Sequence, residues 1–281
     1  MPIEGRDVLR PGPSRWGGRA ARARQPESPP LHAYLLDADD DLAAQLDIRT
    51  RVAVRQLATA RTLEADTGEC DLAAWFAAVG NGPGLLILDG LVAVDTRITN
   101  RTVTELLGTG DLLQPPSRHV DDIVERVASW RALDACRFAL LDAEFAERML
   151  PWPQIGRALM RRAERRAEDL NVLRAISCQP RLEVRLVLLL WHLAARWGRV
   201  EPTGIHLILP LTHRLLGQLV AAERPSISHA LGRLADSGLL SGTAGDWHLH
   251  GSLDAHLETL TDGTARLVAV RPHRSTNGRI A

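Results

Sequence analysis

A group of side chains with hydrogen-bond donors stands in one short stretch, residues 212–233, of the 281-residue sequence. It combines arginine and histidine with short hydroxyl residues: Thr212, His213, Arg224, Ser226, His229 and Arg233. An arginine guanidinium can donate two parallel hydrogen bonds to guanine N7 and O6, while hydroxyl groups near helix N-termini suit phosphate oxygens. Together these residue types offer the chemistry of double-stranded DNA recognition.

The apolar residues around this group predict two short helices joined by a tight turn within residues 209–240. Thr212 can cap the first helix, whose apolar residues recur at spacings of one, three and four: Leu215, Leu216, Leu219 and Val220. Ala221 and Ala222 permit a close turn, and Pro225 suits the first turn of the second helix. That helix should bury Ile227, Ala230, Leu231 and Leu234, which leaves its polar residues on the other faces.

Two short runs of alternating apolar residues follow Gly238, at residues 239–241 and 246–250, around a Gly-Thr-Ala-Gly turn. They predict a β-hairpin, which would form a wing beside the two helices. An amphipathic helical hairpin without a ligand is the alternative, but this order of helix, turn, Arg-Pro-Ser and helix is scarce outside DNA-binding domains. We therefore expect a winged helix-turn-helix DNA-binding domain at residues 179–251.

The stretch also carries specific motifs: Leu211-Thr212, Gly217-Gln218, Arg224-Pro225-Ser226-Ile227-Ser228, then Leu231, Leu234, Gly238 and Leu239-Leu240. With these it resembles the winged helix of the cyclic-AMP receptor and fumarate-nitrate regulator (Crp/Fnr) family of bacterial transcription regulators. The resemblance implies that Arg224, Pro225 and His229 stand where the family reads bases. It places Thr212 and His213 where the family contacts phosphates. Several members have glutamate at the Pro225 position and arginine at the His229 position, so their target sequence does not carry over.

Short β-type runs separated by Gly, Asp and Asn fill the sequence from Leu85 onward, after a mostly helical stretch at residues 31–75. They predict a small β-roll within residues 31–150. The run LLILDGLVAV followed by LLGTGDLL resembles the cyclic-nucleotide-binding domain that usually accompanies this winged helix. The resemblance then covers roughly residues 35–250. We expect an α+β protein with an N-terminal β-roll, a long dimerisation helix and a C-terminal winged helix-turn-helix.

The expected ligand site of the β-roll departs from the family pattern. Nucleotide-binding members hold the ribose with a Gly-Glu-Leu segment and the cyclic phosphate with Arg-Ser/Thr-Ala. Here residues 110–116 read Gly-Asp-Leu-Leu-Gln-Pro-Pro, which lacks the carboxylate and loses backbone donors to proline. Arg126 is the one matching candidate ligand residue, and a surface salt bridge explains it equally well. We expect no standard cAMP binding, with a regulator that responds to cAMP or another small ligand through an unusual pocket as the alternative.

Cofactor chemistry has little support in the sequence. Cys70, Cys136 and Cys178 are far apart, so we expect small core residues and no iron–sulfur cluster. His119 is expected to be a loop residue and not a haem ligand. A metal enzyme on a β-barrel is a third alternative, but residues 80–118 contain no histidine to bind the metal. We expect a protein that is not an enzyme and holds neither cofactor nor metal.

A continuous helix is predicted at residues 151–178, where apolar residues recur every three or four positions as in a coiled-coil seam. This seam should pair with a second copy of the chain through Ile155, Leu159, Ala163, Leu170 and Leu173. A core helix that lies on the β-roll is the alternative. Pro180 ends the helix, and an apolar helix with Trp191 and Trp197 should follow as the core of the DNA-binding domain.

The charges are divided along the chain although its net charge is zero. Residues 31–150 hold eleven Arg against twenty acidic residues, whereas residues 151–250 hold thirteen Arg against eight. A basic C-terminal half fits contact with phosphates. Residues 1–30 should form a disordered Arg/Pro/Gly-rich tail and residues 252–281 a polar tail. Without a membrane span or signal peptide, we expect a cytoplasmic protein whose partners are double-stranded DNA, a second copy and, as further candidates, RNA polymerase and an unknown small effector.

Overall fold

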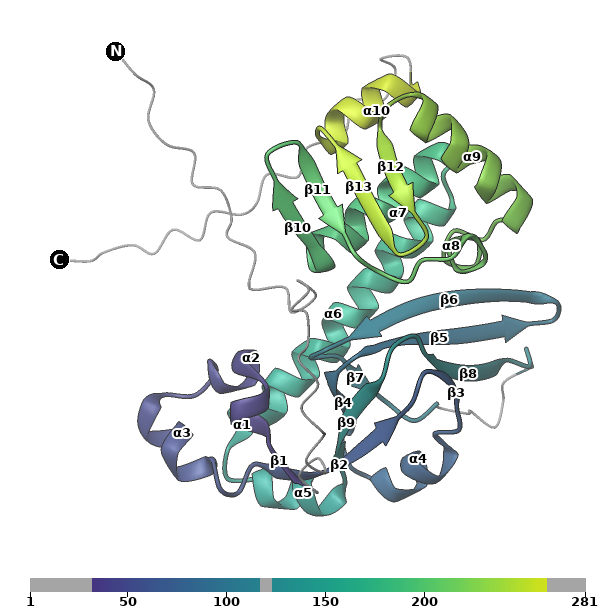
Figure 1. Ribbon diagram of the computed structural model, residues 1–281. Helices are drawn as coiled ribbons and strands as arrows, with labels where there is room; N and C mark the ends of the chain where they lie inside the picture. The colour runs from purple at the N-terminus through teal and green to yellow at the C-terminus, as the bar shows by residue number, and fades with distance from the viewer. Residues whose placement is uncertain (1–31, 117–122, 262–281) are drawn as a thin grey trace, which may run out of the picture.

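The computed structural model describes residues 32–116 and 123–261, which form a β-rich unit and a smaller mixed unit joined by the long helix α6 (Pro153–Ser177) (Figure 1). This arrangement confirms the expected α+β fold. The predictions for residues 1–30, for His119 and for residues 262–281 lie outside the described residues. No helix of the described part is long and apolar enough to cross a membrane.

The β-rich unit is a roll of two antiparallel sheets, as the short apolar runs predict. One sheet has the order β1 (His32–Tyr34), β2 (Thr59–Ala65), β9 (Cys136–Leu141), β4 (Gly84–Asp89) and β7 (Leu112–Leu113). The other has the order β3 (Gly68–Cys70), β8 (Val127–Ala132), β5 (Leu91–Ile98) and β6 (Arg101–Gly108). The alternating inward side chains of both sheets form a common apolar core, which includes Ile87, Val92, Leu107, Leu113 and Phe138.

Short helices surround the roll: α1 (Leu35–Ala38), α2 (Asp40–Ala43), α3 (Ile48–Val54), α4 (Ala73–Val79) and α5 (Ala143–Met149). The sequence predicts one helix followed by an extended piece at residues 42–63, but the helix is divided. The Asp47 carboxylate accepts hydrogen bonds from the N–H groups of Arg49 and Thr50, so it caps a new helix inside the expected one. The extended piece is β2, which pairs with β1 and β9.

Helix α6 corrects part of the predicted dimer seam. Ile155 and Leu159 are 0% and 4% exposed within a single chain, because they pack into the core that the roll shares with α1, α2 and α5. Leu173 packs against the core of the second unit. These three residues face the chain itself, as the alternative of a core helix predicts, whereas Leu170 remains exposed and Ala163 half-buried.

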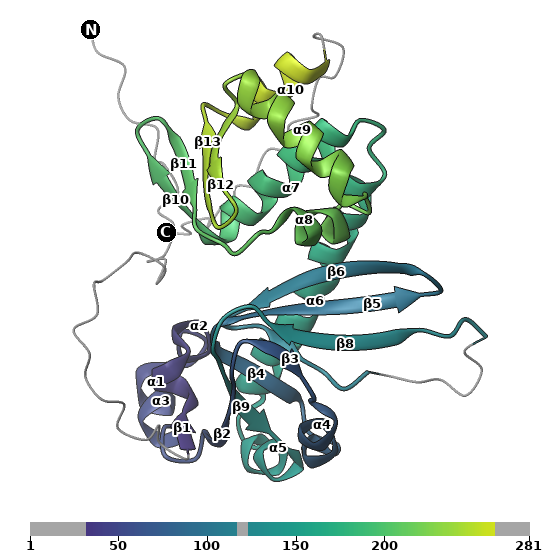
Figure 2. The ribbon, with the colours of Figure 1, turned by 45° about the vertical axis from the view of Figure 1, so that its right-hand side comes forward.

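The second unit is built on the apolar helix α7 (Leu182–Trp197). Helices α8 (His213–Leu219) and α9 (Arg224–Asp236) pack on it, and the wing strands β12 (Leu240–Thr243) and β13 (Asp246–His250) follow. The sequence analysis missed the hairpin of β10 (Gly198–Glu201) and β11 (Gly204–Leu207), which extends the wing into a sheet of order β10-β11-β13-β12. Figure 2 shows this sheet on one side of α7 and the two helices on the other.

Two smaller expectations are wrong. A polar tail was expected from residue 252, but α10 (Leu253–Thr261) packs against α7 and buries His256 beside Trp191, so the unit extends to residue 261. The cysteines were expected in the core, which holds for Cys136 and partly for Cys70, whereas Cys178 at the end of α6 is exposed. The local spacing of apolar residues predicts neither the docking of α10 on α7 nor the exposure of Cys178, because both depend on residues distant in sequence.

Candidate DNA-binding surface and interdomain junction

The turn between α8 and α9 is fixed by local backbone interactions. The Leu215 N–H donates to the Thr212 hydroxyl at 3.2 Å, so Thr212 caps α8 as predicted. Ala221 adopts a φ of 54°, and the Ala222 N–H donates to the Gly217 carbonyl at 2.8 Å. A Cβ at Gly217 would lie 2.5 Å from the Ala222 carbonyl oxygen, so this close approach requires glycine.

Helix α9 buries one face and exposes the other. Ile227, Ala230, Leu231 and Leu234 are at most 5% exposed, in agreement with the predicted spacing. Pro225 lies in the first turn, where its missing N–H leaves no intrahelical bond unmade. The structure brings Arg224, Ser226 and His229 to the exposed surface of this helix. An outward row of donors on a helix of this kind is what entry into a major groove requires.

Two of the predicted DNA-binding residues already have protein partners. His213 Nδ1 lies 2.8 Å from the Ser228 hydroxyl, which joins α8 to α9. The Arg233 Nε donates to Glu183 of α7 at 2.6 Å. Burial raises the pKa of Glu183, but hydrogen bonds from its own backbone N–H and from Arg233 outweigh burial, so the pKa is lowered overall. Arg233 therefore attaches α9 to the domain core.

The N-terminal end of α9 also contacts the β-roll. Arg101, at the start of β6, donates to the carboxylate of Glu223 at 2.6 Å. Glu223 is the N-cap residue of α9 and directly precedes Arg224. In Figure 2 the β5–β6 hairpin lies beneath α8, with which β6 packs. The end of the helix that carries Arg224 is thus held beside the roll.

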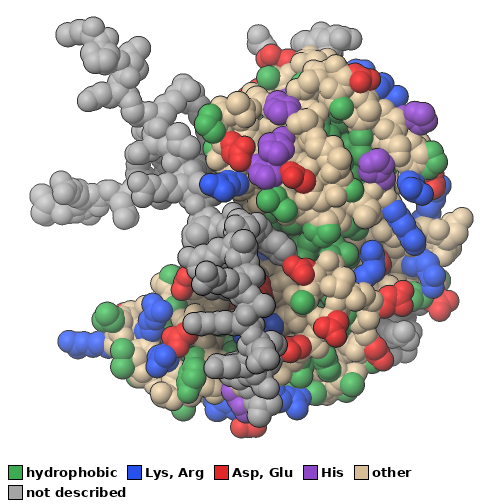
Figure 3. Space-filling model, viewed as in Figure 1, with side chains coloured by type: hydrophobic (Ala, Val, Ile, Leu, Met, Phe, Trp, Pro, Cys, Tyr) green, Lys and Arg blue, Asp and Glu red, His purple; other side chains and the backbone are tan. Residues whose placement is uncertain are grey.

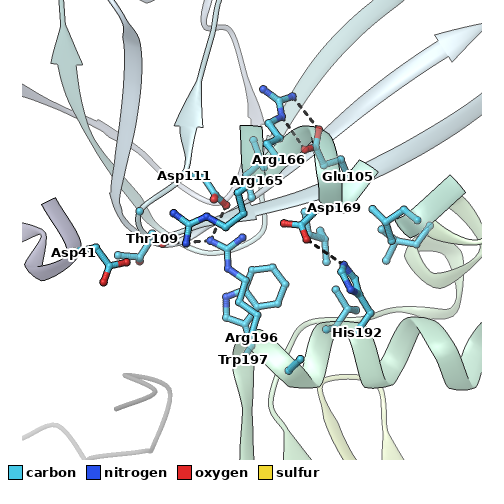
Figure 4. A pocket seen from close by; sticks show the side chains of 17 residues that line it. Asp41, Glu105, Thr109, Asp111, Arg165, Arg166, Asp169, His192, Arg196 and Trp197 are labelled. Carbon is cyan, nitrogen blue, oxygen red and sulfur yellow. Dashed lines mark hydrogen bonds and ion pairs between the residues drawn. The ribbon is translucent and has the colours of Figure 1, made fainter. Parts of the chain in front are cut away.

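The Gly-Asp turn between β6 and β7 connects the roll to both long helices (Figure 4). The Asp111 carboxylate accepts from the Gly108 N–H at 2.8 Å and pairs with Arg196 of α7 at 2.8 Å. On the other side, Arg162 of α6 donates to the Gly110 carbonyl and pairs with Asp39 at 2.6 Å, where both side chains are buried. This is the segment that the Crp/Fnr resemblance assigns to ribose binding, and here it binds protein arginines.

The tip of α7 packs closely on the same segment. A Cβ at Gly108 would lie 3.2 Å from the Trp197 ring, so the indole lies against the backbone of β6. The Arg196 guanidinium stands 4.6 Å from the centroid of the same ring. Gly108 and Trp197 belong to different units, so this direct contact sets the position of one unit relative to the other.

A cleft of about 680 Å³ opens at this junction, between the roll, α6 and α7. Its charged lining residues are largely paired: Arg166 makes two hydrogen bonds to Glu105, at 2.7 and 2.9 Å, and His192 lies 3.9 Å from Asp169. Burial lowers the pKa of His192, against the opposing charge of Asp169. Figure 4 shows Arg165 and Arg196 together beside Asp111.

Arg126 is placed elsewhere. It is exposed and directly precedes β8, whose first residue pairs with Arg97 near the tip of the β5–β6 hairpin. It is absent from the lining of the junction cleft. Inside the roll, aromatic rings pack edge to face, with centroids 5.1 Å apart for Phe76 and Trp130 and 5.5 Å for Trp75 and Phe138. Large apolar side chains thus occupy the interior of the described roll.

Sequence reasoning missed the junction residues Glu105, Asp111 and Arg196 and the anchor Glu183. Arg162, Arg166 and Asp169 do recur at spacings of four and three on α6, a signal that they share one helix face. The partners on the roll come from strands more than fifty residues away, so no local pattern could pair them with α6.

Comparisons with known proteins agree with this geometry. Residues 184–250 match the family model of the Crp-like helix-turn-helix domain. CooA from Carboxydothermus hydrogenoformans has the same fold, with 17% identity, a TM-score of 0.54 and coverage of 71% of this chain and 87% of that chain. The c-di-GMP-responsive global regulator CLP from Xanthomonas campestris has 18% identity, a TM-score of 0.54 and coverage of 72% and 100%. FixK2 from Bradyrhizobium japonicum has 15% identity, a TM-score of 0.54 and coverage of 70% and 96%. No curated protein matches the chain.

The fold, the exposed face of α9 and the matched domain lead to one conclusion. CLP, one of the solved proteins that share this fold, is a global regulator. The chain thus contains a Crp-like helix-turn-helix domain at residues 184–250, and its described residues have the same fold as the solved structures of CooA, CLP and FixK2.

Proposed function

We propose that this chain is a transcription regulator of the Crp/Fnr type that binds a palindromic operator as a homodimer in the cytoplasm, with α9 of each copy in a major groove. The observation that supports this most is the division of α9 into a fully buried apolar face and an exposed face with Arg224, Ser226 and His229. Two such helices, related by a two-fold axis and about 34 Å apart, would match successive turns of one face of B-DNA.

The roles of the individual side chains follow from their positions. Arg224 stands at the N-terminal end of α9 with an exposed side chain, so we assign it the bidentate contact with guanine. His229, further along the helix, can make a single hydrogen bond to a base. Thr212, His213 and Ser226 lie near helix N-termini and suit phosphate oxygens. We assign Arg233 to positioning α9, since its guanidinium is paired with Glu183.

The dimer would form through the side of α6 that faces away from the roll. Met160 and Leu170 are 65% and 43% exposed there, and the small residues Gly156, Ala163 and Ala167 lie on the same helix face at spacings of three and four. Small side chains permit two helices to approach closely. This surface retains Ala163 and Leu170 of the predicted seam. Gly156, Met160 and Ala167 take the place of the seam residues that are buried within the chain.

We propose that the roll does not bind cAMP in the manner of nucleotide-binding Crp/Fnr members. Three features support this: the apolar filling of the roll, the engagement of Asp111 with Arg196, and the two prolines at residues 115 and 116. The junction cleft favours a second candidate, in which a small charged effector binds between the roll and α7 and changes their relative position. Calorimetry with cAMP and cGMP tests the first proposal, and micromolar binding of either would overturn it.

The central experiment selects DNA from a random pool with the purified full-length chain. The proposal expects an inverted repeat whose half-sites are centred one helical turn apart, bound by two chains per duplex. Enrichment of a single half-site bound by one chain would contradict the homodimer.

A further inference from the structure

The outer face of the wing sheet carries a histidine and carboxylate cluster that DNA recognition by α9 does not use. The residues come from three adjacent strands: Glu201 on β10, His206 on β11, and Asp246 and His248 on β13. His206 and His248 are direct cross-strand partners in the antiparallel pair β11–β13. Their neighbours Leu207, Trp247 and Leu249 point inward and are buried, so the alternation of the strands turns both imidazoles outward. Figure 3 shows histidines gathered over this sheet beside acidic side chains.

The geometry of the cluster is close to that of a metal site. Glu201 Oε1 lies 3.6 Å from His206 Nδ1, and Glu201 Oε2 lies 3.9 Å from His248 Nε2. One ligand atom from each of the three residues lies within 4.8 Å of the others. In a tetrahedral site with metal–ligand bonds of about 2.0–2.2 Å, ligand atoms are about 3.3–3.6 Å apart. Small rotations of exposed side chains would therefore close the set around one ion.

Asp246 supplies a second, independent feature. Its Oδ1 lies 2.7 Å from His206 Nε2, which fixes the proton on that nitrogen. The opposite nitrogen, Nδ1, then presents its lone pair toward the Glu201 carboxylate. Two electron-pair donors that face each other are stabilised by a cation between them. A carboxylate that orients the distal N–H of a ligating histidine is the usual outer shell of such sites.

The arrangement of the two imidazole rings suits one shared ion. The rings of His206 and His248 are stacked, with centroids 4.1 Å apart and planes 13° apart. The stacking places His206 Nδ1 and His248 Nε2 beside the same Glu201 carboxylate, where the two imidazoles can share one divalent ion. The pair also lies in a partly desolvated position, with His206 18% and His248 36% exposed.

We propose that Glu201, His206 and His248 bind a divalent transition-metal ion of the zinc class, with Asp246 orienting His206. Imidazole together with carboxylate suits Zn²⁺, Co²⁺ and Ni²⁺, whereas Mg²⁺ and Ca²⁺ prefer oxygen ligands alone. Three protein ligands leave a fourth position open toward solvent. Spacing rules for metal sites along the sequence miss this set, because its members are brought together only by the sheet.

The ion would join β10 to β13 across the central strand β11. Strand β10 begins directly after Trp197 of α7, and β13 forms the wing hairpin with β12. Metal binding would therefore attach the wing to the end of α7. Since metal binds the folded sheet and not the unfolded chain, the melting temperature should rise with metal concentration.

The test uses the full-length chain without a histidine tag. Co²⁺ is titrated first, because tetrahedral Co²⁺ has a strong visible absorption, and Zn²⁺ is then added to displace it. The proposal expects one ion per chain, displaced by Zn²⁺ and not by Mg²⁺, together with a rise in melting temperature. His206→Ala and His248→Ala should each abolish the absorption, and Asp246→Asn should weaken Zn²⁺ binding about 10- to 100-fold.

His250→Ala is the matched control, because His250 lies on the same face of β13 but pairs with Ser241 at 2.7 Å. It should bind Co²⁺ like the original chain. Equal loss of binding in His250→Ala and His206→Ala would show diffuse histidine binding and overturn the assignment. So would an octahedral, weakly absorbing Co²⁺ complex that His206→Ala leaves unchanged. Circular dichroism of each variant shows whether it is folded, and Glu201→Gln, which preserves side-chain shape, provides a second test of the ligand set.

Discussion

At the scale of single residues, the exposed surface of α9 separates side chains that we propose read DNA from a side chain that holds the helix. Apolar spacing along the sequence was sufficient to place Arg224, Ser226 and His229 outside, since the buried face leaves them no other direction. It could not show that Arg233 pairs with Glu183, because the partner lies fifty residues earlier on α7. Exposure is thus predictable from local pattern, whereas pairing is not.

Replacement of Arg224 by alanine should reduce discrimination between DNA sequences. The lost guanine contact should cost about 1–3 kcal/mol on the cognate palindrome and little on random DNA. Fluorescence anisotropy on both DNAs at one salt concentration measures the difference. Thr212→Ala is the matched comparison, since loss of a phosphate contact and of the α8 cap should weaken both complexes by similar factors. Full discrimination by Arg224→Ala would show that another residue reads the bases.

At the scale of elements, α6 shows how one repeating pattern can serve two surfaces. Its apolar residues recur every three or four positions all along the helix, and the sequence alone could not decide which of them face the roll. The roll occupies the face with Ile155 and Leu159, while Met160, Ala163 and Leu170 lie on another. The length and the ends of the helix were predictable from the prolines that flank it. Its partners were not, because sheets assembled from distant segments supply them.

Arginine at Leu170 and arginine at Leu159 should therefore have different effects. Leu170→Arg places like charges in the proposed dimer surface, so it should give a folded monomer in sedimentation at micromolar concentration. Leu159→Arg buries a charge in the core of the roll, so it should lower the free energy of unfolding of the single chain by several kcal/mol. A Leu170→Arg protein that stays dimeric would contradict the proposed surface. Circular dichroism melting distinguishes the two variants.

Helix α10 should dock less firmly as the pH falls. His256 is 1% exposed, accepts from the Trp191 indole N–H at 3.3 Å through Nδ1 and contacts the His250 carbonyl through Nε2. Burial lowers its pKa from the ordinary 6.5, against the opposing effect of the hydrogen bond that His256 Nε2 donates to the His250 carbonyl. The native state thus binds fewer protons than the unfolded state, so this contribution to stability is complete above pH 6.5 and is lost as the pH falls below it.

Urea unfolding followed by circular dichroism, at pH 7.5 and at about pH 5.5, measures this effect. The original chain should lose more stability between the two pH values than His256→Gln, whose amide cannot become charged in this range. His192, whose pKa burial also lowers, should contribute in the same direction in both proteins, so the difference between them isolates His256. Equal pH dependence in the two proteins would show that His256 has no part in it.

At the scale of the whole molecule, the roll and the helix-turn-helix unit share an apolar core, in which Leu91, Ala93 and Leu106 of the roll pack with the core around α7 and α8. Polar contacts and the contact of Trp197 with Gly108 add to it. Arg101 and Glu223 join the β5–β6 hairpin to α9, and Asp111 and Arg196 join the Gly-Asp turn to α7. The sequence analysis predicted both units and their order correctly. It could not predict these contacts, because each joins residues that are far apart and belong to elements without a shared periodicity.

Reversal of the charge at Arg101 should release the N-terminal end of α9 from the roll. Arg101→Glu places two carboxylates side by side, so the affinities for cognate DNA and for random DNA should both rise. The rise should be at most about fivefold, because an exposed ion pair of this kind contributes no more than about 1 kcal/mol. Anisotropy measures this change. The double variant Arg101→Glu with Glu223→Arg restores the ion pair. It should therefore reverse the part of the increase in DNA affinity that comes from the release of α9 from the roll. Unchanged affinity in the single variant would show that the contact does not restrain α9.

The contact of Trp197 with Gly108 gives the protein an internal optical reporter. Because the indole lies against the backbone of β6 and beneath the Arg196 guanidinium, its surroundings would change with a rotation of one unit against the other. The emission of this one side chain, obtained as the difference between the original chain and Trp197→Phe, would then record the movement as it happens. A stopped-flow mixing experiment with the selected DNA would thus time any such rotation without an attached dye.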